Sequence, residues 1–315
     1  MLNGKAQNLF DDITFSRVLG ASKHTKMIGE MLLSIVDEKD TDCRKTVERI
    51  QTVADYFRET RGQNSRAIYN AINIMLGGAK LQEPASVEEL YIQMHNRIDS
   101  FGQKSKENTK TAVSYAAALC KQWQTILIFD YSSTIDAFVQ ALDHPMTVVI
   151  PESRALDGGR PFVQNALNAG HKVKFIPDTT MMEALRSCDA AFTGAETMYP
   201  DGSVFNTIGT DIMGVLCKEM GIPLYVVSPL IKVDPRPVEG YVRLAPMPFD
   251  YSVRLAEKWP ETLRQAVDFS GIKLVKIPAQ YITAIISEAG IVPAGAFFGV
   301  AMDYNKSLEG SGAVC

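Results

Sequence analysis

Carboxylates and hydroxyls follow short apolar runs in this 315-residue chain, at positions where such groups could move protons and hold anions. Asp130 and Glu196 each come just after such a run, and Ser132 and Ser133 lie two and three residues beyond Asp130. A carboxyl group can act as a general acid or base, and hydroxyls at a helix N-terminus can help to hold an anion. Ser132 and Ser133 fit a plain helix N-cap equally well.

Basic side chains that could hold a phosphate stand in three polar segments. Arg154 closes the segment 151–154, which a Gly-Gly-Arg sequence follows, while Lys232 comes after a later apolar run. Arg61 lies in the polar turn 60–65, together with Gln63. A guanidinium can bind two phosphate oxygens at once, and glycine lets backbone amides approach an anion. Arg154 also fits a surface ion pair, and the turn also fits a plain connection between helices.

The elements that must position these residues change in kind after Trp123. Short apolar, β-rich runs alternate there with segments of helical length such as 134–142 and 162–169. Alternation of this type predicts right-handed βαβ units, hence an α/β fold with a Rossmann-like, doubly wound, mostly parallel sheet. In such sheets ligands bind at the carboxyl ends of the strands, where Asp130 and Glu196 stand. The strands are expected at 125–129, 147–150, 172–176, 190–193 and 224–228.

The first third of the chain is predicted to be helical. From about Thr14 to Gln122 apolar residues recur at steps of three and four, which indicates about five helices. Asp42 is placed to begin a helix and Gly77 to end one, and Ser86 with a glutamate three residues later forms a capping-box pattern.

We therefore expect a helical N-terminal domain over 1–122 and a Rossmann-like domain over 123–315. Within the second, the proline-rich segment 234–270 fits neither a regular sheet nor a helix, and it is a candidate lid or a surface excursion. A strand is expected at 273–277, and a helix at 281–287.

Composition and charge exclude several classes of protein. Lys and Arg number 32 against 36 Asp and Glu, a net charge of −4 without blocks of like charge, so nucleic acid is not an expected ligand. No apolar run approaches the roughly 18 residues of a membrane span, and the N-terminus lacks a signal pattern; a cytoplasmic protein without membrane contact is expected. Five scattered cysteines and four histidines indicate neither disulfides nor a metal site, and no cofactor is expected.

Several motifs, in order, resemble one family: the methylthioribose-1-phosphate and ribose-1,5-bisphosphate isomerases together with the alpha, beta and delta regulatory subunits of initiation factor 2B. The most specific is Gly194-Ala195-Glu196 with an Asp-Gly turn and the sequence Asn-Thr-Ile-Gly-Thr at 206–210. Further matching segments are 18–22, 60–62, 151–154, 159–160, Lys232 and 278–293. The resemblance implies a helical domain followed by a Rossmann-like, sugar-phosphate-binding domain, and a homodimer.

The chain also departs from the family motifs. Family isomerases have a catalytic Cys where Asp130 stands and a catalytic Asp where Glu196 stands. Thr207 occupies the place of a Lys, and Leu19 that of an Arg in the turn that continues into Gly20 and Ala21. The family chemistry therefore cannot be carried over unchanged.

The resemblance implies an aldose–ketose isomerase for a phosphorylated pentose of the ribose 1-phosphate type. Two carboxylates in one cleft repel, which keeps a proton on one of them; Glu196 is the expected base and Asp130 the acid. Residues expected at the phosphate are Gly20, Ala21, Arg61, Ser132, Ser133, Arg154 and Lys232, with Gln63 and Asn206 on sugar hydroxyls.

Two alternatives remain open. One is a non-catalytic protein that binds a sugar phosphate or nucleotide and regulates a partner, similar to the initiation factor 2B alpha subunit. It accounts for the missing Cys and for Thr207 in place of Lys. The other is an enzyme with a different reaction on a ribose-like substrate.

Overall fold

The computed structural model describes residues 2, 4–15, 17–18, 20–38, 40–241 and 248–310, with side chains up to residue 308. Leu19, one of the motif departures, lies outside these residues. The chain forms two compact units. Unit 1 comprises residues 1–107, 231–233 and 302–315, and unit 2 comprises 108–230 and 234–301. The units divide inside a long helix, at Glu107, whereas the domain boundary at residue 122 stays a prediction.

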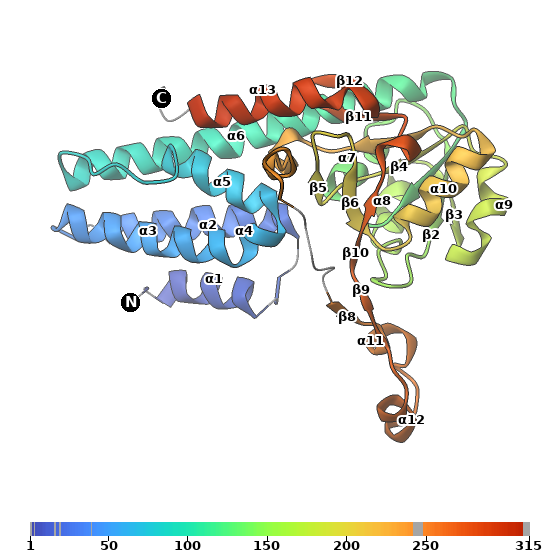
Figure 1. The fold of residues 1–315 in the computed structure, drawn as a ribbon, viewed down its shortest axis with the longest axis horizontal. Coiled ribbons are helices and arrows are strands. Elements are labelled where there is room, and N and C mark those ends of the chain that lie inside the picture. Colours follow the sequence, from blue (N-terminus) through green and yellow to red (C-terminus); the bar gives the residue numbers. More distant parts are fainter. Residues whose placement is uncertain are drawn as a thin grey trace. The chain divides into compact units, whose positions relative to one another are not determined.

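Unit 1 is helical (Figure 1). Its helices are α1 (Gly4–Thr14), α2 (Ala21–Val36), α3 (Cys43–Glu59), α4 (Arg61–Asn64), α5 (Arg66–Leu76), the first part of α6 (Val87–Leu119) and the end of α13 (Phe297–Gly310). Helix α1 precedes the predicted helical region, and its Ala6 and Ile13 are buried in the same apolar core as Ile28, Phe57 and Met75.

Local sequence signals fix these helix ends as expected. The Asp42 carboxylate accepts a hydrogen bond from the Lys45 N–H at 3.0 Å and caps α3. Gly77 ends α5 in a left-handed conformation, at φ 72°. The Ser86 hydroxyl accepts a hydrogen bond from the Glu89 N–H at 3.1 Å. In return, the Glu89 carboxylate accepts one from the Ala85 N–H.

Unit 2 is built on a mostly parallel sheet in the strand order β12-β11-β7-β4-β1-β2-β3. These strands are β1 (Thr125–Phe129), β2 (Thr147–Pro151), β3 (Lys172–Ile176), β4 (Ala190–Thr193), β7 (Leu224–Val227), β11 (Ala284–Ser287) and β12 (Gly290–Pro293). Only the β11–β12 pair is antiparallel in the sheet as described. All five strands predicted between 125 and 228 are present, and the expected α/β fold class is confirmed.

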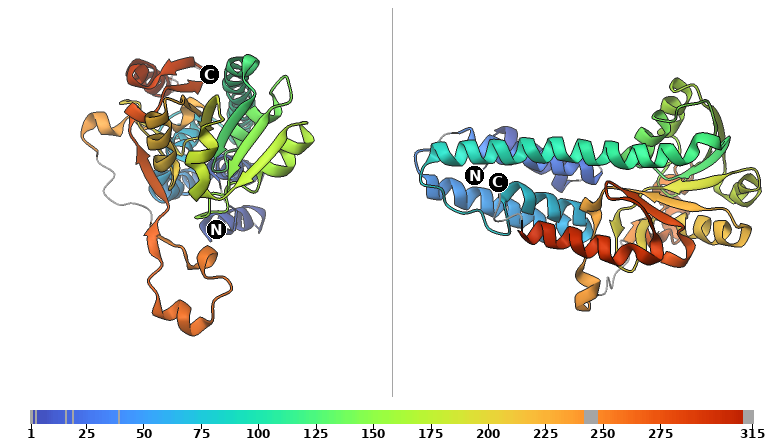
Figure 2. Two further views of the ribbon diagram at one scale, coloured as in Figure 1. Left: turned by 90° about the vertical axis from the view of Figure 1, so that its right-hand side faces the viewer. Right: turned by 90° about the horizontal axis from the view of Figure 1, so that it is seen from above.

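Helices lie on both faces of this sheet (Figure 2). One face is covered by the C-terminal part of α6 with α7 (Ser133–Gln140) and α8 (Phe162–Asn168), which share a core with Ile126 and Ile128 of β1. On the other face, Gly209 at the start of α10 (Thr210–Met220) lies against the Phe129 ring, and α10 packs on α9 (Met181–Leu185). Short 3-10 helices are η1 (Cys120–Gln122), η2 (Asp178–Thr180), η3 (Leu230–Lys232), η4 (Arg236–Glu239), η5 (Ala279–Tyr281) and η6 (Ala294–Ala296).

Two small antiparallel sheets complete unit 2. The first pairs β6 (Val204–Thr207) with β5 (Thr197–Met198) and with β10 (Leu274–Ile277), the strand expected at 273–277. The second pairs β8 (Pro248–Asp250) with β9 (Ser270–Ile272). Residues 248–272, hereafter the arm, also hold α11 (Ser252–Leu255) and α12 (Glu261–Ala266) and extend away from the main sheet in both figures.

The helix predicted at 281–287 was wrong. This segment begins with the last residue of η5 and ends with β11, whose four residues are all buried between β7 and β12. A strand buried on both faces has no alternation of apolar and polar residues, so its short apolar run resembles part of a buried helix.

In the described residues, no helix is both long enough and apolar enough to cross a membrane.

Candidate functional site

Asp130 and the Gly-Ala-Glu sequence follow the two strands at which the chain reverses its direction across the sheet. From β1 the chain adds β2 and β3 on one side and then β4 on the other. Phe129, the last residue of β1, pairs in register with Thr193, the last residue of β4. Asp130 and Gly194 therefore leave the sheet side by side, at the switch point where open α/β sheets bind ligands.

Asp130 is buried, and both of its carboxylate oxygens are held by hydroxyls. Only 7% of the surface of this residue is exposed to solvent. The Ser153 hydroxyl donates to Oδ1 at 2.8 Å, and the Thr207 hydroxyl donates to Oδ2 at 2.6 Å. Hydrogen bonds to an ionised group are among the strongest in proteins. Two of the residues that depart from the family motifs, Asp130 and Thr207, are thus joined by one hydrogen bond.

The backbone around Asp130 adopts conformations that side-chain-bearing residues rarely take. Asp130 has φ 57°, and Ser153 has φ 49°. A β-carbon on Gly158 would lie 2.1 Å from Asp130 Oδ1, so only glycine fits there. The loop after β2 is fixed by the Asp178 carboxylate, which accepts the N–H groups of Ser153 and Arg154, each at 2.8 Å. Strain of this kind clusters at functional sites.

Burial raises the pKa of the Asp130 carboxyl above its ordinary value, because the charged form loses its water. The hydroxyls of Thr207 and Ser153 and the positive charge of Lys273 act in the opposite direction. A carboxyl in this environment can hold a proton and release it when the charge around it changes.

Glu196 differs from Asp130 in its surroundings. Its backbone N–H donates to the Phe205 carbonyl at 2.8 Å, and its side chain is half-buried. Within the part of the chain that the structure describes, the Glu196 carboxylate has no hydrogen-bond or ion-pair partner, and no hydrogen bond joins it to Asp130. Pairing of these two carboxylates stays a prediction.

The predicted anion-binding hydroxyls lie at the start of α7. The Ser132 side chain caps this helix by accepting the Ile135 N–H at 3.5 Å, while Ser133 is exposed. A β-carbon on Gly194 would lie 2.6 Å from the Ser132 hydroxyl oxygen, which places Ser132 against the strand end of β4. Capping and anion binding both use this helix terminus.

Asn206 is committed to the protein framework. It is buried on β6, and its amide nitrogen donates to the hydroxyls of Thr193 at 2.8 Å and Thr210 at 3.3 Å. These bonds tie β4, β6 and α10 together. A contact of Asn206 with a sugar hydroxyl stays a prediction.

Arg154 lies on the surface beside the strand end of β2. One guanidinium nitrogen is 4.0 Å from the Glu152 carboxylate, and another donates to the Arg254 carbonyl of the arm at 3.2 Å. The side chain therefore links the loop after β2 to the arm, and the ion pair is exposed enough to contribute little stability.

Five predicted site residues belong to unit 1. Gly20 has φ 103° and precedes α2, whose first residue is Ala21. The Arg61 guanidinium donates to the carbonyls of Ile13 and Thr14 at the end of α1. The remaining two are Gln63, exposed on α4, and Lys232, half-buried on η3.

Lys232 is placed by its neighbours on both sides. The buried Asn70 amide donates to the carbonyls of Ile231 at 2.9 Å and Val233 at 3.1 Å. These two hydrogen bonds fix the backbone on either side of Lys232 to unit 1. Ligand contacts of the unit 1 residues stay predictions.

Sequence reasoning did not assign roles to the groups that hold Asp130. Ser153, Thr207 and Gly158 were part of motifs or turns, and only their proximity to Asp130 in space gives them a role. The glycine pair after the 151–154 motif was the one available signal, because it marks a close backbone approach.

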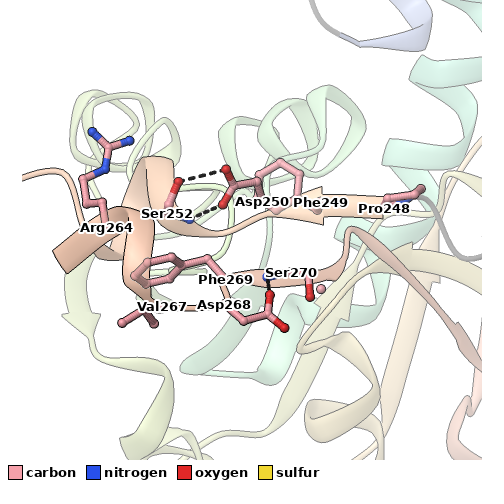
Figure 3. A pocket seen from close by; sticks show the side chains of 10 residues that line it. Pro248, Phe249, Asp250, Ser252, Arg264, Val267, Asp268, Phe269 and Ser270 are labelled. Carbon is pink, nitrogen blue, oxygen red and sulfur yellow. Dashed lines mark hydrogen bonds between the residues drawn. The ribbon is translucent and has the colours of Figure 1, made fainter. Parts of the chain in front are cut away.

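A cavity of about 480 Å³ lies on the arm and contains none of the predicted site residues (Figure 3). Its two carboxylates are already engaged: Asp250 accepts from Ser252, and Asp268 accepts from the Ser270 N–H. Tyr251, between the two strands of the arm, lies against Gly271 and donates its hydroxyl to the Ile272 carbonyl at 2.7 Å. We therefore place the candidate site at the strand ends, where chemistry-bearing groups converge.

Comparison with known proteins agrees with this fold and these motifs. The family model described as "Initiation factor 2 subunit family" matches residues 18–294. The ribose 1,5-bisphosphate isomerase of Archaeoglobus fulgidus is 24% identical over 286 residues, covering 90% of this chain and 88% of the relative. A Pyrococcus horikoshii protein named putative translation initiation factor eIF-2B subunit 2-like is 23% identical over 302 residues, covering 93% and 98%.

Among solved structures, that of 5-methylthioribose 1-phosphate isomerase from Pyrococcus horikoshii OT3 matches with a TM-score of 0.76. The match covers 95% of this chain and 88% of the other at 18% identity, a level that shows the shared fold. The resemblance identified from the motifs is confirmed. This chain belongs to the initiation factor 2 subunit family, which the match over residues 18–294 shows.

Proposed function

We propose that this chain is an aldose–ketose isomerase for a phosphorylated pentose of the ribose 1-phosphate type. The observation that carries the proposal is Asp130, a buried carboxyl at the switch point of the sheet that two hydroxyls hold in place. Burial of an ionisable group costs stability when no group of opposite charge is in direct contact with it. A functional role is therefore the best explanation for a buried carboxyl at this position. Relatives named as ribose 1,5-bisphosphate and methylthioribose-1-phosphate isomerases support this substrate class.

In the proposed reaction the acetal carbon C1, which carries the phosphate, is reduced, while C2 is oxidised to a ketone. The Asp130 carboxyl gives its proton to the ring oxygen as the bond from C1 to that oxygen breaks. The Glu196 carboxylate takes the proton from C2, which forms an enol, and returns it to C1. Asp130 then takes the proton of the C2 hydroxyl, which leaves a ketone at C2 and restores both side chains.

The environments of the two carboxyls suit these roles. The raised pKa of Asp130 brings its carboxyl closer to the protonated form that an acid needs, and the negative charge of a bound phosphorylated ligand acts in the same direction. Glu196 is half-buried and, within the described residues, its carboxylate is not engaged by another side chain. In unit 2 the start of α7, with Ser132 and Ser133, and the neighbouring Arg154 are the groups that we propose for the phosphate.

A ligand screen followed by a conversion assay tests this proposal. We expect ribose 1,5-bisphosphate, methylthioribose 1-phosphate or a related pentose 1-phosphate to raise the melting temperature. Proton NMR should then show the ketose product. Asp130→Asn and Glu196→Gln should each lower the rate by about 100-fold or more, the range of general acid–base catalysis.

The control is Glu183→Gln, a change at an exposed carboxylate of α9 whose partner is Arg186. It should leave conversion unchanged. Conversion that persists at the wild-type rate in both Asp130→Asn and Glu196→Gln would contradict the carboxylate mechanism.

The second candidate function is a regulatory protein that binds a sugar phosphate or nucleotide without turnover. Relatives named as initiation factor 2B-like proteins favour it. So do Asp130 and Thr207, which stand where the family isomerases have a Cys and a Lys. Stabilisation by a ligand that is not converted is its expected result. We also propose a homodimer, for which light scattering should give twice the mass of the chain.

A further inference from the structure

Asp178 follows the end of β3, two strands away from Asp130 in the order β1-β2-β3. Strands β2 and β3 are parallel, and their last residues pair in register. Ser153 and Asp178 each come two residues after these partners, so they leave the sheet side by side. There the Asp178 carboxylate accepts the Ser153 N–H with Oδ1 and the Arg154 N–H with Oδ2, each at 2.8 Å.

The Ser153 side chain connects this strand end to the buried carboxyl of Asp130. Its hydroxyl donates to Asp130 Oδ1 at 2.8 Å, and Ser153 is only 1% exposed. The Ser153 backbone has φ 49°, a left-handed conformation that is unfavourable for a residue other than glycine. Such a conformation persists only where surrounding contacts enforce it. The two hydrogen bonds to Asp178 are formed at this position, so they help to fix the direction of the Ser153 side chain.

We propose that Asp178 is a positioning residue of the candidate site: through the two backbone N–H groups it holds the Ser153 hydroxyl on Asp130, and Asp130 therefore gives up its proton more readily. A donor on a carboxylate favours the ionised form over the protonated one. The effect of Asp178 on the titration of Asp130 is independent of the proposed function, whereas its effect on conversion rests on that function.

The charges around Asp130 give this proposal a sign that can be measured. The groups in direct contact with Asp130 are the uncharged hydroxyls of Ser153 and Thr207, and the charge of Lys273 also acts on it. Removing the negative charge of Asp178 would by itself move the Asp130 titration to lower pH, because like charges disfavour each other. Release of the Ser153 hydroxyl moves the titration to higher pH, so the direction of the change separates the two effects.

The test is an NMR titration of protein with 13C-labelled aspartate carboxyls, in which the Asp130 signal is assigned by its loss in Asp130→Asn. We expect Asp178→Ala and Asp178→Asn to move the Asp130 titration to higher pH by about 0.5–1 pH unit, the equivalent of one hydrogen bond. Ser153→Ala should move it by a similar amount. In the Ser153→Ala background, Asp178→Ala should give no further rise, because the donor that Asp178 holds is absent.

Asp189→Asn is the matched control. The Asp189 carboxylate also accepts two consecutive backbone N–H groups, those of Gln124 at 2.8 Å and Thr125 at 2.9 Å, but at the opposite end of β1. This change should lower the melting temperature and leave the Asp130 titration unchanged. The assignment of Asp178 is overturned if neither Asp178 variant moves the titration to higher pH, or if Asp178→Ala raises it equally with and without the Ser153 hydroxyl.

The pH profile of conversion, measured with ribose 1,5-bisphosphate and methylthioribose 1-phosphate, is a second readout that a merely structural role would not move. If Asp130 is the acid, the limb at which its proton is lost should move to higher pH in Asp178→Ala and stay in place in Asp189→Asn. A limb that stays in place while the titration moves would contradict Asp130 as the acid. If the titration moves as expected and wild-type protein converts no pentose phosphate, the assignment of Asp178 stands and the isomerase proposal fails.

Discussion

Replacing Thr207 by valine tests whether Asp130 is ionised and held by a hydroxyl in the folded protein. Valine keeps the shape of threonine and removes the hydroxyl that donates to Asp130 Oδ2 at 2.6 Å. Thr207 and Asp130 are 3% and 7% exposed, so water cannot replace the lost donor. A hydrogen bond to a charged group contributes about 1.5–3 kcal/mol. We expect Thr207→Val to lower the free energy of unfolding by about that amount at neutral pH.

The sign of the pH dependence follows from Asp130. Its pKa is raised by burial, so the folded state binds the proton more tightly than the unfolded chain does. The contribution of Asp130 to stability is therefore most favourable below its ordinary pKa and is lost as the pH rises through the folded-state pKa. Removing the Thr207 hydroxyl raises that pKa further, which enlarges the loss at neutral pH.

Urea unfolding at about pH 4 and about pH 7.5 measures this difference. Because the pKa of Asp130 is raised, more of this carboxyl is protonated in the folded state near the lower pH than at the higher pH. Thr207→Val should therefore cost less there, approaching the roughly 0.5–1.5 kcal/mol of a neutral hydrogen bond. Thr207→Ser keeps the hydroxyl and should retain the wild-type pH dependence. An equal loss of stability for Thr207→Val at both pH values would refute an ionised Asp130 held by Thr207.

Two further changes probe the site and the helical unit. Gly158→Ala should displace Asp130, since the added carbon would lie 2.1 Å from Oδ1; a loss of about 1–3 kcal/mol in urea unfolding and lower conversion are expected. Its control is Gly102→Ala on α6, where no atom lies within 4 Å of the added carbon and stability should rise by up to about 1 kcal/mol. Asp42→Ala should lower stability by about 1 kcal/mol through loss of the α3 cap, measured by thermal unfolding. No change in stability for Gly158→Ala or Asp42→Ala would contradict the packing or the cap described.

Short-range signals in the sequence were sufficient for most elements of this fold. The strand β1 and the residue that follows it were located from one apolar run, and the cap at Asp42 was located from its residue type. Such signals succeed because capping, turn formation and burial of a short strand depend on residues only a few positions apart.

The same reasoning failed where burial on two faces removed the pattern. The segment that forms β11 was predicted to be helical because its alternation is lost between β7 and β12. Helix α1 was missed, and the short strands β5 and β6 were not predicted. Strand β6 pairs with β10, which is distant in the chain, and β5 has only two residues, too few to show a period.

By itself, the sequence determined that carboxylates stand at the ends of two strands and which family the motifs resemble. Only the tertiary structure decided what surrounds them. The hydroxyls that hold Asp130 come from residues 23 and 77 positions away in the chain, and Glu196, expected to pair with it, has its own half-buried environment. The environment of a buried charge is set by sheet order and strand register, which bring distant segments together and which no local pattern of residues encodes.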